Sequence, residues 1–141
     1  MKYFIRYILL TSMSLFLGAC SSVSTKPSEL VSISLTRNDA SSAEPITVII
    51  QQPVEQNNFV GATYSTVMQQ ALDNGVTRYV MLGTQKQHNI VMSVTQTPLA
   101  VYFIMKHQPV SNWKFLIDEP QASSQFFTIN KNSIVKEKID E

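Results

Sequence analysis

The chain has 141 residues, of which 44% are apolar and 15% charged, with 11 Lys and Arg against 10 Asp and Glu, and it contains a single cysteine. This length predicts one small domain. A net charge of +1 lacks the clustered basic surface that nucleic-acid binding requires. One cysteine excludes an intramolecular disulfide and a cysteine metal cluster, and two histidines are too few for a histidine-rich metal site.

The first 19 residues have the pattern of a secretory signal peptide. Lys2 and Arg6 form a short positive region, and residues 7–17 form an apolar stretch. A membrane-spanning helix needs about 20 apolar residues, so this stretch is expected to be cleaved and not retained as a span. It ends in Leu17-Gly18-Ala19-Cys20, which resembles the bacterial lipobox, where the cysteine thiol receives a diacylglycerol.

The sequence therefore predicts that Cys20 becomes the lipidated first residue of the mature protein. The alternative is a buried structural thiol in an ordinary signal peptide or membrane helix. Ser21 stands where an inner-membrane retention signal has Asp, which favours the outer membrane. Cleavage would remove Lys2 and Arg6, leaving 9 basic against 10 acidic residues and a net charge of −1 over 122 residues.

After the cysteine, the chain is expected to begin with a tether and two strands. Residues 20–29 are small and polar and predict a flexible tether. Apolar residues alternate with Ser and Thr from Leu30 to Thr36, which predicts a partly buried strand. Residues 38–45 have the composition of a loop, and the β-branched run 46–50 predicts a second strand that ends before Pro53.

One short helix is predicted between Phe59 and Gly75, because apolar residues recur there at helical spacing. The face it would bury consists of Phe59, Tyr64, Val67, Met68, Ala71 and Leu72. Six short strands are predicted after it: Arg78–Leu82, Asn89–Thr95, Leu99–Lys106, Trp113–Ile117, Phe126–Ile129 and Ile134–Ile139. Short strands separated by polar turns indicate an antiparallel sandwich or barrel.

Two of these strands carry more detailed expectations. Residues 100–105 are apolar on both faces, which predicts the most buried strand. Alternation places Trp113, Phe115 and Ile117 on one side and Lys114 on the other. The last residues, 136–138, fit either the end of a strand or a helix.

No catalytic, cofactor or metal site is predicted. The four glycines do not form a phosphate loop or a dinucleotide fingerprint, and the Gly-x-Ser-x-Gly motif is absent. His88 is interpreted as a solvated turn residue and His107 as a strand end, neither with an acidic partner nearby in sequence. The neighbouring carboxylates Asp118 and Glu119 would point to opposite faces of a strand. Three dispersed methionines are interpreted as core residues: Met81, Met92 and Met105.

The order of these features resembles the outer-membrane lipoprotein of type VI secretion systems, the TssJ (SciN, VasD) family. The similar segments are the lipobox, the strand 31–35, the loop from Asn38 to Pro45, the strand 46–50, Asn58-Phe59-Val60-Gly61-Ala62-Thr63-Tyr64, Val80-Met81-Leu82-Gly83, Val101-Tyr102-Phe103-Ile104 with Asn112-Trp113-Lys114, and the closing hairpin 127–134. The chain departs from the family at Gln51-Gln52-Pro53, where a Tyr-Gln-Leu ending is usual, at Thr63 in place of Asp, and in its short first loop.

The resemblance implies a mainly β protein, an antiparallel two-sheet β-sandwich (transthyretin-like) with one short helix. It implies three regions: a lipoprotein signal peptide at 1–19, the acylated Cys20 and a flexible tether at 20–29, and the sandwich at 30–141. The lipid would hold the protein at the periplasmic face of the outer membrane. A loop of the sandwich would bind the periplasmic C-terminal region of TssM, and so tether the inner-membrane components TssL and TssM without catalysis. The loop residues expected to contact the partner are Asn38, Asp39, Ser41, Ser42 and Glu44.

A second class of function stays open. A small periplasmic lipoprotein of this size also fits a secretin pilotin, or a soluble-ligand or lysozyme-inhibitor module.

Overall fold

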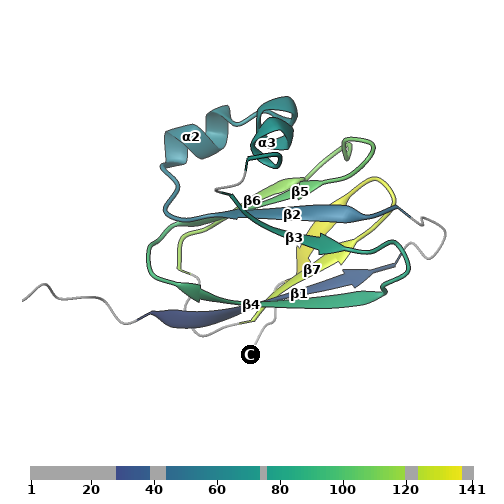
Figure 1. Cartoon of the computed structure of the whole chain (residues 1–141), viewed down its shortest axis with the longest axis horizontal. Coiled ribbons are helices and arrows are strands. Elements are labelled where there is room, and N and C mark those ends of the chain that lie inside the picture. The colour runs from purple at the N-terminus through teal and green to yellow at the C-terminus, as the bar shows by residue number, and fades with distance from the viewer. Residues whose placement is uncertain (1–27, 39–43, 74–75, 120–123, 138–141) are drawn as a thin grey trace, which may run out of the picture.

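In the residues that the structure describes, the protein is a sandwich of two four-stranded sheets with two short helices on one outer face (Figure 1). The computed structural model describes residues 28–38, 44–73, 76–119 and 124–137. The elements within them are β1 (Glu29–Arg37), β2 (Ile46–Gln51), α2 (Gln56–Gly61), α3 (Tyr64–Gln70), β3 (Thr77–Met81), β4 (Gln87–Val94), β5 (Leu99–Ile104), β6 (Lys114–Ile117), β7 (Gln125–Ile129) and β8 (Ile134–Glu137). The predicted two-sheet sandwich is confirmed.

The strand order is β4-β1-β7-β8 in one sheet and β3-β2-β5-β6 in the other. All pairings are antiparallel except that of β1 with β7, which is parallel. The predicted closing hairpin is confirmed, with Ile129 opposite Ile134. The parallel pair was not predicted, because strand order depends on contacts between segments far apart in the chain.

The core lies between the two sheets and is built from alternating strand positions. Every second residue of β1 from Val31 to Arg37 faces inward and is buried. β5 is buried at every position but the last, as its two-sided apolar sequence predicts, because the helices cover its second face. Met81 and Met92 are buried in this core and Met105 packs against it, which confirms their interpretation as core residues.

The helical segment is two helices, where the sequence predicts one between Phe59 and Gly75. Ala62 and Thr63 are extended and separate α2 from α3. Thr63 caps α3: its hydroxyl accepts from the Thr66 backbone N–H, and the Thr66 hydroxyl accepts from the Thr63 N–H. This capping box starts a new helix at a position where periodicity alone continues the old one.

The helical segment buries fewer side chains than the sequence predicts. Val67 and Ala71 pack on the sheet with Tyr102, as predicted. Met68 and Leu72 do not: 49% of Met68 and 79% of Leu72 is exposed. Their placement on the buried face was wrong, because α3 turns only a narrow stripe with Val67 and Ala71 toward the sheet, and Leu72 lies beyond the end of the helix.

Trp113 lies on the helix side of the sheet and not in the sandwich core with Phe115 and Ile117. β6 begins only at Lys114, and Asn112 immediately before Trp113 has a left-handed backbone, with φ 55°. Strand alternation therefore does not extend back to Trp113. His88 was also misplaced: it is partly buried within β4, opposite Leu35, and is not a turn residue.

Candidate partner-binding site

The structure describes the two ends of the loop that the sequence predicts to bind a partner. Asn38 directly follows β1, and Glu44 stands two residues before β2. Asp39, Ser41 and Ser42 lie outside the described residues, and so does Cys20. The described part of the site is therefore the base of the loop, where strands from both sheets end.

Arg37 joins this base together. It is the last residue of β1 and is only 7% exposed, at an inward position that continues the alternation of Val31, Ile33 and Leu35. Its guanidinium donates to the backbone carbonyl of Glu44 at 2.9 Å and to that of Gly83 at 3.3 Å. One buried cation thus holds the far end of the loop and the turn between β3 and β4 against the end of β1.

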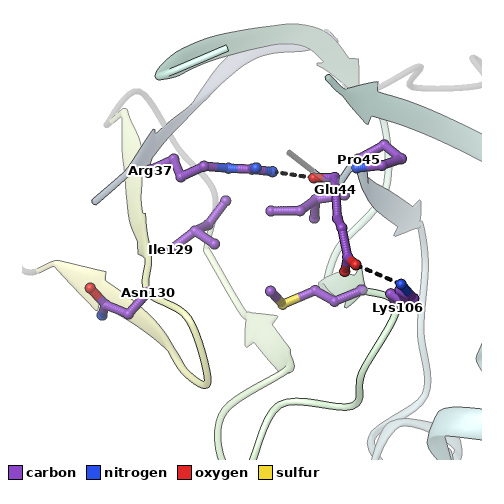
Figure 2. A pocket seen from close by; sticks show the side chains of 8 residues that line it. Arg37, Glu44, Pro45, Lys106, Ile129 and Asn130 are labelled. Atoms are coloured by element: carbon purple, nitrogen blue, oxygen red, sulfur yellow. Dashed lines mark hydrogen bonds and ion pairs between the residues drawn. The ribbon is translucent and has the colours of Figure 1, made fainter. Parts of the chain in front are cut away.

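Glu44 makes a second contact, through its carboxylate. Its Oε1 lies 2.8 Å from Nζ of Lys106, which follows β5 (Figure 2). Hydrogen bonding to Glu44 and attraction to its charge raise the pKa of Lys106. Both side chains are solvent-accessible, so water screens the pair and it adds little to folding stability. The pair places two opposite charges next to each other at the surface.

Asn38 closes the other side of the base. Its backbone N–H donates to the carbonyl of Ile129 at 3.0 Å, and its side-chain Nδ2 lies 3.5 Å from Oδ1 of Asn130. The two described ends of the loop, Asn38 and Glu44, are therefore attached to different sheets, one through β7 and the other beside β5.

A hollow lies between these contacts, as Figure 2 shows. Its apolar lining comes from Pro45, Ile46, Met105 and Ile129, and its polar lining from Arg37, Glu44, Lys106 and Asn130. It holds about 270 Å³ of empty space, including space open to solvent. The exposed charged groups in its lining are Glu44 and Lys106, whereas Arg37 is buried.

The sequence prediction named Asn38 and Glu44 but not Arg37, Lys106 or Asn130, which the structure places beside them. The signal for Arg37 was present: it is a cation at an inward position of an alternating strand, followed directly by a polar loop. Lys106 and Asn130 are far away in sequence and carry no local signal. Only the pairing of β2 with β5 and of β1 with β7 brings them to this end.

The described residues contain no candidate metal site and no candidate membrane-spanning helix. No group of three or more His, Cys, Asp or Glu side chains among them could hold a metal ion. None of the described helices is long and apolar enough to cross a membrane.

Comparison with known proteins gives a match to one family and to several solved structures. Residues 47–130 match the family described as IglE, N-terminal domain. Lip of Serratia marcescens, a membrane-bound component of the type VI secretion system, is similar with a TM-score of 0.64 and 10% identity, over 82% of this chain and 100% of that one. The type VI lipoprotein TssJ1 of Pseudomonas aeruginosa is similar with a TM-score of 0.54 and 14% identity, over 81% and 100%.

A third similar structure is described as the type VI secretion protein TssM C-terminal domain from EAEC, with a TM-score of 0.64 and 9% identity, over 79% of this chain and 99% of that one. No curated protein matches this chain. The predicted resemblance to the TssJ lipoproteins is confirmed, and at these identities it is a likeness of fold.

Proposed function

This chain belongs to the family of the IglE N-terminal domain, a lipoprotein family related to type VI secretion, and on that basis we propose that it is a lipoprotein of a type VI secretion membrane complex. The observation that carries the proposal is the extent of the fold match. The sandwich covers 100% of both type VI lipoproteins to which it is similar. The TssM C-terminal domain has a similar fold over 99% of its length, and the lipobox pattern that ends at Cys20 is what favours a lipoprotein here.

The proposed anchor is a lipid on Cys20. Residues 1–19 would be removed as a signal peptide, and residues 20–29 would link the acylated cysteine to the sandwich at 30–141. β1 already begins at Glu29, so the linking segment would be short and would hold the domain close to the membrane. Two or three acyl chains, at about 0.8 kcal/mol per buried methylene, make such attachment effectively permanent. Ser21 supports the periplasmic face of the outer membrane as the destination.

The proposed tether is the loop between β1 and β2. Its ends are held by Arg37 and by Asn38, which supports a binding loop on a rigid scaffold. The proposed partner is the periplasmic C-terminal region of TssM, through which the inner-membrane components TssM and TssL would be connected to the outer membrane. The function is mechanical and involves no turnover.

The anchor is tested by Cys20→Ser in a strain that depends on this gene for type VI secretion. Loss of the acylation site should move the protein from the outer-membrane fraction to the soluble periplasm and abolish secretion. A Cys20→Ser protein that still fractionates with the outer membrane, or still supports secretion, would show that lipid on this residue is not the anchor.

The tether is tested by measuring the affinity of the full chain for the periplasmic C-terminal region of TssM. Glu44→Lys reverses the charge at the loop base and should weaken binding by about tenfold or more. The matched control is Glu119→Lys, an equal reversal of charge. Glu119 follows β6, whose last residue, Ile117, pairs with Leu99 at the start of β5. Met105 and the loop base lie at the other end of β5. Equal binding by both variants contradicts the loop as the contact. Recovery of secretin in place of TssM favours a pilotin.

A further inference from the structure

The edge strand β4 differs from the other edge strands of the sandwich. It is eight residues long, and in the described part of the chain it pairs only with β1, so its second side is an edge (Figure 1). Edge strands are normally protected from pairing by short length, charged side chains, proline or bulges. The other three edges, β3, β6 and β8, have four or five residues, and each contains a Lys or Arg. β4, QHNIVMSV, has no Lys, Arg, Asp, Glu, Pro or Gly.

The direction of the backbone groups of β4 follows from its pairing with β1. In an antiparallel pair, opposite residues alternate between exchanging both hydrogen bonds and exchanging none. The Arg37 N–H donates to the Lys86 carbonyl at 2.8 Å, so alternate pairs from this point, including Leu35 with His88 and Ile33 with Ile90, are the bonded ones. The N–H and C=O groups of the intervening residues Gln87, Asn89 and Val91 therefore point away from β1.

One end of this edge is already occupied by a side chain. Gln52 donates through Nε2 to the Ser93 carbonyl at 3.2 Å and accepts at Oε1 from the Thr95 N–H at 3.2 Å. These contacts confirm that odd-numbered residues of β4 direct their backbone groups outward. They also limit the open edge to the stretch from Gln87 to Val91, with Asn89 at its centre.

We propose that this edge is an interface between two copies of the chain, formed by antiparallel pairing of β4 with β4 across a twofold axis at Asn89. In this register Asn89 lies opposite Asn89 of the second copy, and Gln87 lies opposite Val91. Each copy contributes three outward N–H and three outward C=O groups, which gives about six backbone hydrogen bonds. The sheet β4-β1-β7-β8 of one copy and the same sheet of the second copy then form one continuous sheet of eight strands.

The chemistry of the edge favours a second copy over a charged partner. A twofold axis places each central residue opposite itself, so a charged centre would repel its own copy. Asn89 has no such cost, because an amide both donates and accepts a hydrogen bond. Val91 is 63% exposed, and Leu30, diagonal to it on β1, is 72% exposed. An added strand at this edge covers part of that apolar surface, and the open stretch extends equally on both sides of Asn89.

The pairing predicts a specific cross-link in the full chain purified in mild detergent. Residues opposite each other in a bonded antiparallel pair have Cα atoms about 5.5 Å apart, within the roughly 4.4–6.8 Å that a disulfide spans. Asn89→Cys should therefore form a covalent dimer on mild oxidation. The control is Ser34→Cys, since Ser34 is the β1 neighbour of Asn89 on the same face. Its two copies would be roughly 15 Å apart, because each lies one strand further from the axis, and should remain uncross-linked. The wild-type chain, oxidised in the same way, shows whether Cys20 alone forms a cross-link.

A second pair of variants tests the interface without a cross-link. Asn89→Lys places two cations directly opposite each other and should raise the dimer dissociation constant, measured by light scattering, by about tenfold or more. Ser34→Lys should leave it unchanged, and circular dichroism checks that both variants fold. A monomeric wild-type chain, equal cross-linking of Asn89→Cys and Ser34→Cys, or cross-linking of Asn89→Cys only to another protein would each overturn the proposal. The inference does not depend on the proposed secretion function.

Discussion

The hydroxyl of Tyr64 makes both hydrogen bonds of the Met105 backbone: it donates to the Met105 carbonyl at 2.6 Å and accepts from the Met105 N–H at 2.7 Å. Tyr64 is the first residue of α3, and Met105 is the first residue beyond β5. A strand that has ended leaves its next N–H and C=O without ladder partners, and here one side chain supplies both. Because Met105 also lines the hollow beside Lys106, this bond attaches the helix layer to the candidate site.

Tyr64→Phe should lower the free energy of unfolding by about 1–3 kcal/mol, since it leaves two part-buried backbone groups unsatisfied while keeping the ring in place. Urea unfolding of the full chain measures the change. The control is Tyr79→Phe, whose hydroxyl makes no hydrogen bond within the described part of the chain and should cost much less. Equal losses in the two variants would mean that the Met105 contact carries no special weight.

The same two residues show how far the sequence predicts this fold. Alternation in β1 and the two-sided apolar run of β5 identify strands, because residues two apart share a face whatever the strand pairs with. Tyr64 was assigned to a buried helix face, but nothing in its surroundings indicates a bond to Met105, which is 41 residues away. The break between α2 and α3 was in principle readable from Thr63 and Thr66, since hydroxyl residues compete for backbone groups at helix starts. Threonine at the third helical position in place of Glu or Gln weakens that signal.

The candidate site was predictable only where it is local. Asn38 and Glu44 belong to one polar loop, so composition finds them together. Arg37 was classed with neither strand nor loop, although a cation in an inward position must find acceptors or lose stability. Lys106 and Asn130 reach the site through sheet order, and the parallel pairing of β1 with β7 was not anticipated from any residue pattern.

Lys114 should stabilise α2. Its Nζ donates to the carbonyls of Phe59 at 2.8 Å, Val60 at 3.0 Å and Ala62 at 2.9 Å, and it lies 5.1 Å from the centre of the Phe59 ring. These are carbonyls at the end of a six-residue helix, where the intrahelical ladder stops. Lys114→Met keeps the apolar stem and removes the charge, so about 1.5–3 kcal/mol of stability should be lost.

Hydrogen exchange distinguishes this local effect from general destabilisation. In Lys114→Met, amides of Gln56–Gly61 should exchange faster, while those of β1 follow only the global loss. Lys131→Met, at an exposed turn position, should change neither. Unchanged protection of α2 in the Lys114 variant would contradict its role as a helix cap.

Arg37 and Lys106 should differ in their effect on stability although both contact Glu44. Arg37 is buried and holds two backbone carbonyls, so Arg37→Met should cost about 1.5–3 kcal/mol. Lys106 is exposed, and Lys106→Met should unfold with the wild-type midpoint in urea. A large loss in the Lys106 variant, or none in the Arg37 variant, would show that the surface ion pair and not the buried cation holds the loop base.

Stability should be constant near neutral pH and fall in alkali. Burial raises the pKa of Tyr64 above its ordinary 10.0, with the Met105 bond acting in the opposite direction, and burial raises that of Tyr102 as well. A raised pKa means that the folded state holds the proton more tightly than the unfolded state. The stabilisation is therefore complete below the unfolded pKa and is lost as the pH rises through the folded one.

Unfolding midpoints in urea should accordingly be flat from about pH 7 to 9.5 and decline above about pH 10. Absorbance near 295 nm, which reports phenolate formation, should show Tyr64 and Tyr102 ionising above 10.0 in the folded chain. In Tyr64→Phe the alkaline decline should become shallower, because one of the groups that lose a tightly held proton is gone. A midpoint that rises above pH 10, or an alkaline decline that Tyr64→Phe leaves unaltered, would show that burial of this hydroxyl does not control the alkaline transition.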